Sequence, residues 1–204
     1  MKTFNLIITG VGGQGGVLAS RLFAEAALAA GYKVRTSETI GMAQREGSVI
    51  SHVRVGERLW SALIPDGAAD VLISLELAEG LKGWTKVAPH GRAIINRRPI
   101  IPPAASLGLT RYDEGAIIEF LQQQGQRVHL IDATAAALET GNAKTTNMVM
   151  LGALSTLPGL PVTADMLWQA AEALLPARLR EINRQAFLTG RSLGSCAGTS
   201  PLVS

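Results

Sequence analysis

The sequence predicts an α/β protein in which helices flank a mostly parallel sheet. Short runs rich in Val and Ile alternate with helical patterns, as in βαβ units. The first apolar run leads directly into a glycine-rich turn, GVGGQGG at 10–16, and a long helical pattern follows. The 204 residues suffice for one domain with a buried core. These observations together favour a Rossmann-like arrangement.

Six segments have the composition of β-strands. They are residues 4–9, 33–38, 48–55, 71–75, 93–96 and 128–131. The alternation at 48–55 is followed by Gly56 and Glu57 and then by a second apolar stretch, 59–64. We therefore expect a hairpin over 48–64, inserted in the parallel scheme. The proline-rich stretch 97–106 is expected to be a loop or an edge excursion, because proline lacks the N–H that a central strand or helix needs.

The first helix is predicted over 14–30, where Leu18, Leu22 and Ala26 share one stripe and Gly31 follows as a C-terminal cap. Helical patterns continue at 113–124, 133–139, 142–158, 165–175 and 177–189. Gly190 is expected to end the last helix. Residues 1–190 are thus predicted to be a single domain, and the small, polar residues 191–204 a flexible tail.

Composition excludes several classes of protein. Hydrophobic residues make up 47% of the chain, but no apolar run reaches the length of a membrane span, and residues 1–9 lack the features of a signal peptide. A soluble, cytoplasmic protein is expected. The net charge is only +3, basic residues are scattered and aromatic residues are 4%, which argues against nucleic-acid binding. Cys196 is the single cysteine, so an iron–sulfur cluster, which needs about four thiolates, would have to belong to another chain.

The glycine turn is the first candidate site. Gly10, Gly12 and Gly15 fit the pattern G-x-G-x-x-G between a strand and a helix, and Glu38 falls near the position of a ribose-binding acid. The unpaired N–H groups and the positive end of the helix dipole would favour an anion such as a phosphate. With Gly13 and Gln14, these residues are predicted to form an anion-binding loop. The alternative is that the glycines only permit close packing of strand and helix.

A second candidate lies in residues 38–51, ETIGMAQREGSVIS. Gly41, Gln44, Arg45 and Ser48 would form a second wall of the site if the first two strands were neighbours. The alternatives are a subunit contact or an ordinary solvated loop. The three histidines share no metal-ligand spacing, and the sequence contains neither a G-x-S-x-G nucleophile motif nor a visible acid–base pair. No catalytic residue or metal ligand is therefore assigned.

Four segments together resemble one family: GVGGQGG at 10–16, SETIGMAQREGSVISHVRVG at 37–56, TNMVMLGAL at 146–154 and EINRQAFLTG at 181–190. They resemble the gamma-type domain of 2-oxoacid:ferredoxin oxidoreductases, and the second segment is most similar to the beta subunit of indolepyruvate ferredoxin oxidoreductases. The resemblance extends to about Gly190. Two residues depart from the family's usual pattern, namely Glu46, in place of a glycine after Arg45, and Ile40, in place of a frequent histidine.

The resemblance implies a subunit without thiamine diphosphate or clusters of its own, inactive alone. A larger alpha-type subunit would hold thiamine diphosphate and iron–sulfur clusters, decarboxylate an aryl pyruvate such as indolepyruvate, and pass electrons to ferredoxin, while the acyl group goes to coenzyme A. The gamma-type domain is linked in the family to coenzyme A, and a homodimer of heterodimers is compatible with this scheme. The alternatives from the residues alone are a stand-alone NAD(P)-binding oxidoreductase and a structural or regulatory interaction domain.

Overall fold

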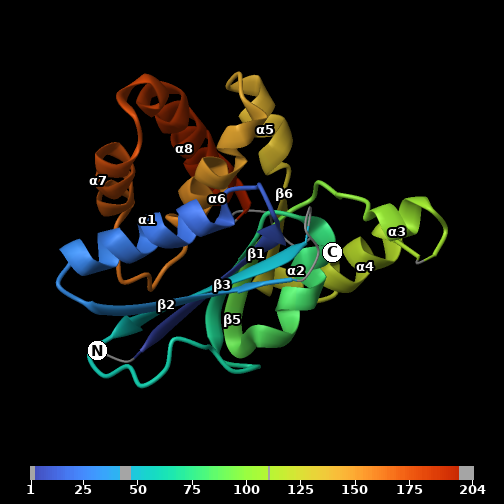
Figure 1. Ribbon diagram of the computed structural model, residues 1–204, viewed down its shortest axis with the longest axis horizontal. Coiled ribbons are helices and arrows are strands. Elements are labelled where there is room, and N and C mark those ends of the chain that lie inside the picture. The colour runs from blue at the N-terminus through green and yellow to red at the C-terminus, as the bar shows by residue number, and fades with distance from the viewer. Residues whose placement is uncertain (1–2, 42–46, 110, 198–204) are drawn as a thin grey trace.

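The computed structural model describes residues 3–41, 47–109 and 111–197 and confirms the α/β class (Figure 1). Its described strands form one six-stranded sheet in the order β2-β3-β1-β4-β5-β6. The strands are β1 (Phe4–Val11), β2 (Lys33–Ile40), β3 (Ser48–Gly56), β4 (Ala69–Ser74), β5 (Val87–Asn96) and β6 (Val128–Ile131). Strands β1, β4, β5 and β6 pair in parallel, whereas β3 runs antiparallel to both of its neighbours, β1 and β2.

Helices cover both faces of the sheet (Figure 1). They are α1 (Gly16–Ala29), α2 (Leu77–Gly83), α3 (Pro103–Ser106), α4 (Glu114–Gln122), α5 (Ala133–Glu139), α6 (Thr146–Leu154), α7 (Ala164–Leu174) and α8 (Ala177–Ala197), with short 3₁₀ turns at Trp84–Lys86, Gly125–Arg127 and Ala143–Thr145. Helices α1, α6, α7 and α8 lie over one face, and α2 and α4 over the other. Two hydrophobic clusters, one on each face, form the core.

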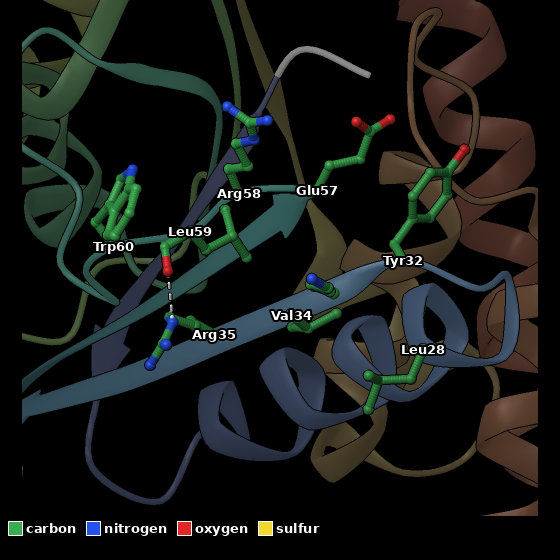
Figure 2. Close-up of a pocket in the computed structure, with 9 residues that line it drawn as sticks. Leu28, Tyr32, Val34, Arg35, Glu57, Arg58, Leu59 and Trp60 are labelled. Carbon is green, nitrogen blue, oxygen red and sulfur yellow. Dashed lines mark hydrogen bonds between the residues drawn. The ribbon is translucent and has the colours of Figure 1, made fainter.

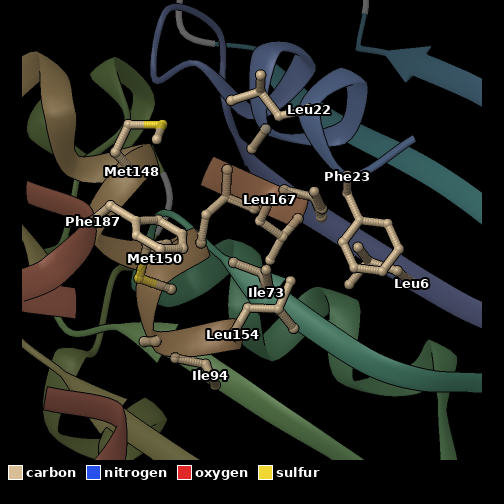
Figure 3. Packing of buried hydrophobic residues seen from close by; sticks show 14 of the residues in the cluster. Leu6, Leu22, Phe23, Ile73, Ile94, Met148, Met150, Leu154, Leu167 and Phe187 are labelled. Carbon is tan, nitrogen blue, oxygen red and sulfur yellow. The ribbon is translucent and has the colours of Figure 1, made fainter. Parts of the chain in front are cut away.

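Helix α1 follows from its sequence. It is rich in alanine, the best helix former, and its buried residues include Leu22, Phe23 and Ala26. The helix ends where Gly31 takes a positive φ of 86° and its N–H donates to the carbonyl of Leu28 at 2.9 Å. Figure 3 shows Leu22 and Phe23 pointing into the cluster that contains Leu6 and Leu167.

Helix α6 is buried along its whole length and packs against α8, which brings the two helix backbones unusually close. A Cβ on Gly190 would overlap the backbone of Val149, and a Cβ on Gly152 would overlap the backbone of Phe187. The prediction that Gly190 ends the last helix is therefore wrong. This glycine lies inside α8, which continues to Ala197, because its missing side chain permits the helix contact. The expected boundary at 190 falls within the helix, and residues 198–204 lie outside the described part.

The expected antiparallel strand at 48–55 is confirmed, but the second strand of the predicted hairpin, at 59–64, is not. Residues 57–64 form no strand, and β3 pairs with β2 instead. The segment crosses one face of the sheet because polar groups of β3 bind its backbone. The Arg54 guanidinium donates to the carbonyls of Ser61 and Leu63, and the Ile64 N–H donates to Nδ1 of His52 at 3.1 Å. None of the described helices is long and apolar enough to cross a membrane.

Candidate functional site

The glycine turn lies at the end of β1 and leads into α1. It borders a hollow of about 290 Å³ between β1, β3 and the residue that follows β4. The hollow is lined by Gly10, Val11, Gly12, Gly13, Gly15, Gly16, Val17, Val49 and Leu75. No described side chain caps α1, whose N-cap residue Gly15 is in the left-handed conformation. The lining thus offers backbone groups and apolar side chains, with the positive end of the α1 dipole beside them.

Gln14 stabilises the turn through two side-chain hydrogen bonds. Its Oε1 accepts a hydrogen bond from the Val11 N–H at 2.8 Å, and its Nε2 donates to the Leu75 carbonyl at 2.9 Å. Both polar groups of the amide are therefore hydrogen-bonded, and the side chain links the turn to Leu75, the residue that follows β4. Gln14 is absent from the lining of the hollow, so its contribution is to hold the backbone in place.

The turn glycines differ in what surrounds them. A Cβ on Gly10 would lie 2.8 Å from Oε1 of Gln14, and one on Gly15 would lie 2.6 Å from Nδ2 of Asn147. Packing accounts for Gly10, whereas Gly15 is required both by packing and by its positive φ of 80°. Gly13 has a φ of +91°, and no heavy atom of the described residues lies within 4 Å of the position of a Cβ, so among these residues only its backbone conformation requires glycine. The open side of the turn is therefore at Gly13.

Asn147 is a residue that sequence reasoning did not assign to this site. It lies in the first turn of α6, is 3% exposed and donates from Nδ2 to the Gly15 carbonyl at 3.2 Å. Its Oδ1 accepts the Met148 N–H at 2.9 Å. The signal was present, because a polar amide stands at the start of an otherwise apolar helical segment. Its partner, 132 positions away, could not be read from the sequence.

The described ends of the second candidate segment, at Gly41 and Ser48, do lie beside the glycine turn, but not for the expected reason. Strands β1 and β2 are not neighbours, since β3 lies between them. The loop returns to the turn because Ser48 of β3 pairs with Val11, and the Gly12 N–H donates to the Gly47 carbonyl at 2.9 Å. The Gly41 N–H donates to the Ser48 carbonyl at 2.8 Å and closes the loop.

Of the expected second-wall residues, the structure places only Gly41 and Ser48. Gln44 and Arg45 lie outside the described residues, as does Glu46. The Ser48 hydroxyl donates to Oε2 of Glu79 at 2.5 Å, and the carboxylate of Glu79, buried within α2, also accepts from Nζ of Lys82 at 2.6 Å. Ser48 thus anchors the start of β3 to α2 and is not one of the residues that line the hollow.

A buried polar network adjoins the Ser48–Glu79 hydrogen bond. Glu76, 2% exposed, caps α2 by accepting the Glu79 N–H at 2.8 Å, and its other oxygen accepts from the Ile100 N–H and the Tyr112 hydroxyl. Burial, and then the hydrogen bond to the Glu76 carboxylate, raise the pKa of Tyr112 above its usual range, so the phenol stays a donor. The network attaches the proline-rich loop to α2, and both oxygens of the Glu76 carboxylate accept hydrogen bonds within it.

Glu38 does not occupy the place of a ribose-binding acid. It is exposed on β2, opposite Ser51 of β3, and one strand separates it from the strand that carries the glycine turn. In a dinucleotide-binding fold the acid stands at the end of the strand next to the first one. The inserted β3 therefore removes the geometric basis for a dinucleotide site that combines the glycine turn with Glu38.

The histidines lie apart from one another and from the turn. His52 accepts from Ile64, and Nε2 of His90 lies 3.1 Å from Oδ1 of Asp70. Desolvation by burial lowers the pKa of both His52 and His129, with smaller contributions from Lys86 and Arg92 respectively. No group of three or more potential metal ligands gathers among the described residues.

Comparison with known proteins identifies the family. The model of the pyruvate ferredoxin/flavodoxin oxidoreductase family matches residues 5–193. The chain belongs to this family. It is 42% identical to the indolepyruvate oxidoreductase subunit IorB of Thermococcus kodakarensis, over 93% of this chain and 95% of that protein. The IorB of Archaeoglobus fulgidus is 37% identical over 91% and 92%. The resemblance found in the sequence is confirmed, and the protein is an oxidoreductase subunit of the gamma type.

Solved structures share the fold. The gamma subunit of a keto/oxoacid ferredoxin oxidoreductase from Geobacter sulfurreducens superposes with a TM-score of 0.69 at 24% identity, over 95% of this chain and 99% of that one. The 2-oxoglutarate:ferredoxin oxidoreductase of Magnetococcus marinus, solved with 2-oxoglutarate, coenzyme A and succinyl-CoA, gives 0.72 at 21% identity. That match covers 96% of this chain but 32% of the other, so in that protein the same fold is one part of a longer chain.

Proposed function

We propose that this chain is the gamma-type subunit of an indolepyruvate:ferredoxin oxidoreductase and that its glycine turn holds a phosphate group of coenzyme A. The observation that carries the assignment is its similarity, over more than nine tenths of both chains, to curated IorB subunits. In the proposed complex, an aryl pyruvate loses CO₂, its acyl group passes to the coenzyme A thiol, and two electrons reach ferredoxin.

The residues of the turn fit a phosphate. The described lining of the hollow contains no carboxylate, and Gly13 leaves open space above the backbone at the start of α1. A volume of about 290 Å³ suits a phosphate or pyrophosphate group and is too small for the whole of coenzyme A. The remainder of the cofactor would lie outside this hollow. When bound, coenzyme A supplies the thiol that accepts the acyl group, and the turn positions its charged part.

The chain itself does not suit the other cofactors of the reaction. Its single cysteine cannot supply the thiolates of an iron–sulfur cluster, and the described residues present no cluster of metal ligands. We therefore place thiamine diphosphate and the clusters on a larger partner subunit and expect the isolated chain to be inactive.

Co-expression tests the assignment. The chain, produced together with the thiamine-dependent catalytic subunit of its own organism, should reduce ferredoxin or a viologen dye with indolepyruvate, and only when coenzyme A is present. The isolated chain should reduce neither. Reduction by the isolated chain, or micromolar binding of NADH to it, would support a stand-alone oxidoreductase instead. Assembly without any effect of coenzyme A would leave only a structural role.

A further inference from the structure

The outer edge of β2 is the end of the sheet, and no described strand pairs with it. Most side chains of β2 are exposed. In an antiparallel pair alternate residues direct their N–H and C=O groups away from the partner strand, so β2 presents a row of backbone donors and acceptors outward. An eight-residue strand of this kind is a ready template for a further strand.

A hollow of about 700 Å³ adjoins the beginning of this edge (Figure 2). It is lined by Leu28, Tyr32, Lys33, Val34, Arg35, Glu57, Arg58, Leu59 and Trp60. The segment that carries Trp60 is held against the strand by Nε of Arg35, which donates to the Leu59 carbonyl at 2.8 Å. The hollow is thus bounded by a fixed loop on one side and by the open strand on the other.

The residue types of the hollow are those that dominate protein interfaces. Trp60 is 92% exposed and Leu28 is 51% exposed, although each could bury a large apolar area. Tryptophan, tyrosine and arginine are the side chains most often found at interface hot spots, and all three occur here. The lining contains three cationic side chains, Lys33, Arg35 and Arg58, and one carboxylate, Glu57. A complementary partner surface would therefore carry negative charge.

We propose that an extended, acidic segment of the catalytic partner subunit docks here as an additional strand on β2, with Trp60 packed against it. This inference rests on the proposed function, which supplies the partner. The hollow is at the start of β2, whereas the glycine turn is beside the end of β2 and the start of β3. Docking at this edge therefore leaves the turn open to coenzyme A.

Hydrogen–deuterium exchange on the free chain and on the co-purified complex tests the position of the interface. We expect amide exchange in residues 33–40 and 57–60 to slow upon assembly. Unchanged exchange in both segments would overturn the proposal. A free chain that is dimeric through this same edge, shown by light scattering and by protection of β2, would assign the surface to a second copy and would also overturn it.

Charge reversal tests the chemistry of the partner. The variant K33E/R58E leaves the Arg35–Leu59 hydrogen bond in place, and we expect it to weaken association with the catalytic subunit at least tenfold. The control R178E/R184E makes the same change in charge at exposed positions of α8 and should associate like the wild type. Trp60→Ala, which changes no charge, should also weaken association.

The possible failures are distinguishable. A wild-type chain that forms no active complex with the catalytic subunit would refute the proposed function and this inference together. An active complex in which K33E/R58E and Trp60→Ala both assemble like the wild type would refute the docking surface alone. Circular dichroism and denaturant unfolding of each variant establish that it is folded.

Discussion

Glycines serve two different purposes in two regions of this molecule. Between α6 and α8, Gly152 and Gly190 face the backbone of the opposite helix, where any side chain would collide. In the turn after β1, a Cβ on Gly13 would meet none of the described residues, and its positive φ is what requires glycine. The first pair permits packing of the core, and the turn glycine shapes a surface that remains accessible. The same residue type therefore permits close packing in one region and, in the proposed function, shapes a binding site in the other.

The largest effect is expected for Gly190→Ala. The new Cβ would overlap the Val149 backbone, which cannot move without separating α6 from α8. We expect a loss of about 3 kcal/mol or more in the free energy of unfolding, at or above the upper end of ordinary overpacking. Denaturant unfolding measures it. Gly115→Ala in α4 is the control, because its Cβ meets only a side-chain oxygen at 3.7 Å and should raise stability by up to about 1 kcal/mol. Equal stabilities would refute the packing argument.

A smaller loss is expected for Gly15→Ala in the turn. It combines a positive φ of 80° with a Cβ placed 2.6 Å from the Asn147 amide, and we expect a cost of about 2 kcal/mol. Asn147→Ala in the same chain removes the collision, so the double variant should lose less than the sum of the two single losses. Strict additivity in denaturant unfolding would mean that Asn147 does not constrain the turn.

The sequence predicted most elements of the fold, but it predicted neither α2 nor the short helix α3 within the proline-rich stretch, and it did not predict the order of the strands in space. Alternating residues identify 48–55 as a strand without indicating which strands it pairs with, and the predicted pairing with 59–64 is wrong. The polar contacts that divert this segment, from Arg54 and His52, link residues that no local pattern connects. The local pattern at Gly190 predicts a helix end for a similar reason, because the role of this glycine depends on a second helix.

Gly13→Ala should cost only about 1 kcal/mol, from the left-handed backbone alone. Gly159 provides a matched control, since it has a φ of +81° and likewise nothing within 4 Å of a Cβ. The two alanine variants should therefore show the same loss in thermal or denaturant unfolding. A much larger loss for Gly13→Ala would mean that the turn is packed against residues not described here and is not open.

The weakest effect is expected from two histidines, the buried His52 and the half-buried His129. The pKa of His52 is lowered from its usual 6.5, so below that pH the unfolded chain binds more protons than the folded one. Stability should therefore decline as the pH falls from about 6.5 toward 5. His129 should contribute in the same direction. The variant H52Q/H129Q should show a shallower decline in urea unfolding across this range, and an unchanged slope would contradict the assignment.

The site was predicted in part. The glycine turn could be predicted from its motif, because a turn between strand and helix has a local signature. Its proximity to Gly41 and Ser48 arises through β3 and not through the expected pairing of the first two strands. Asn147 and Glu79 could not be assigned from the sequence, since each acts through hydrogen bonds to distant segments. The roles of Gln14 and Ser48 also differ from a direct ligand contact, because their polar groups are already bonded within the fold.

The Michaelis constant for coenzyme A in the assembled oxidoreductase tests the central claim most directly. The methyl group that Gly13→Ala adds on the open side of the turn would obstruct the phosphate and weaken its hydrogen bonds to the backbone. Such bonds to a charged group contribute about 1.5–3 kcal/mol, so this constant should rise about tenfold or more. The constant for indolepyruvate should not change, and Gly159→Ala should alter neither. Equal constants for coenzyme A in the wild type and in both variants would contradict the placement of the cofactor's phosphate at the glycine turn.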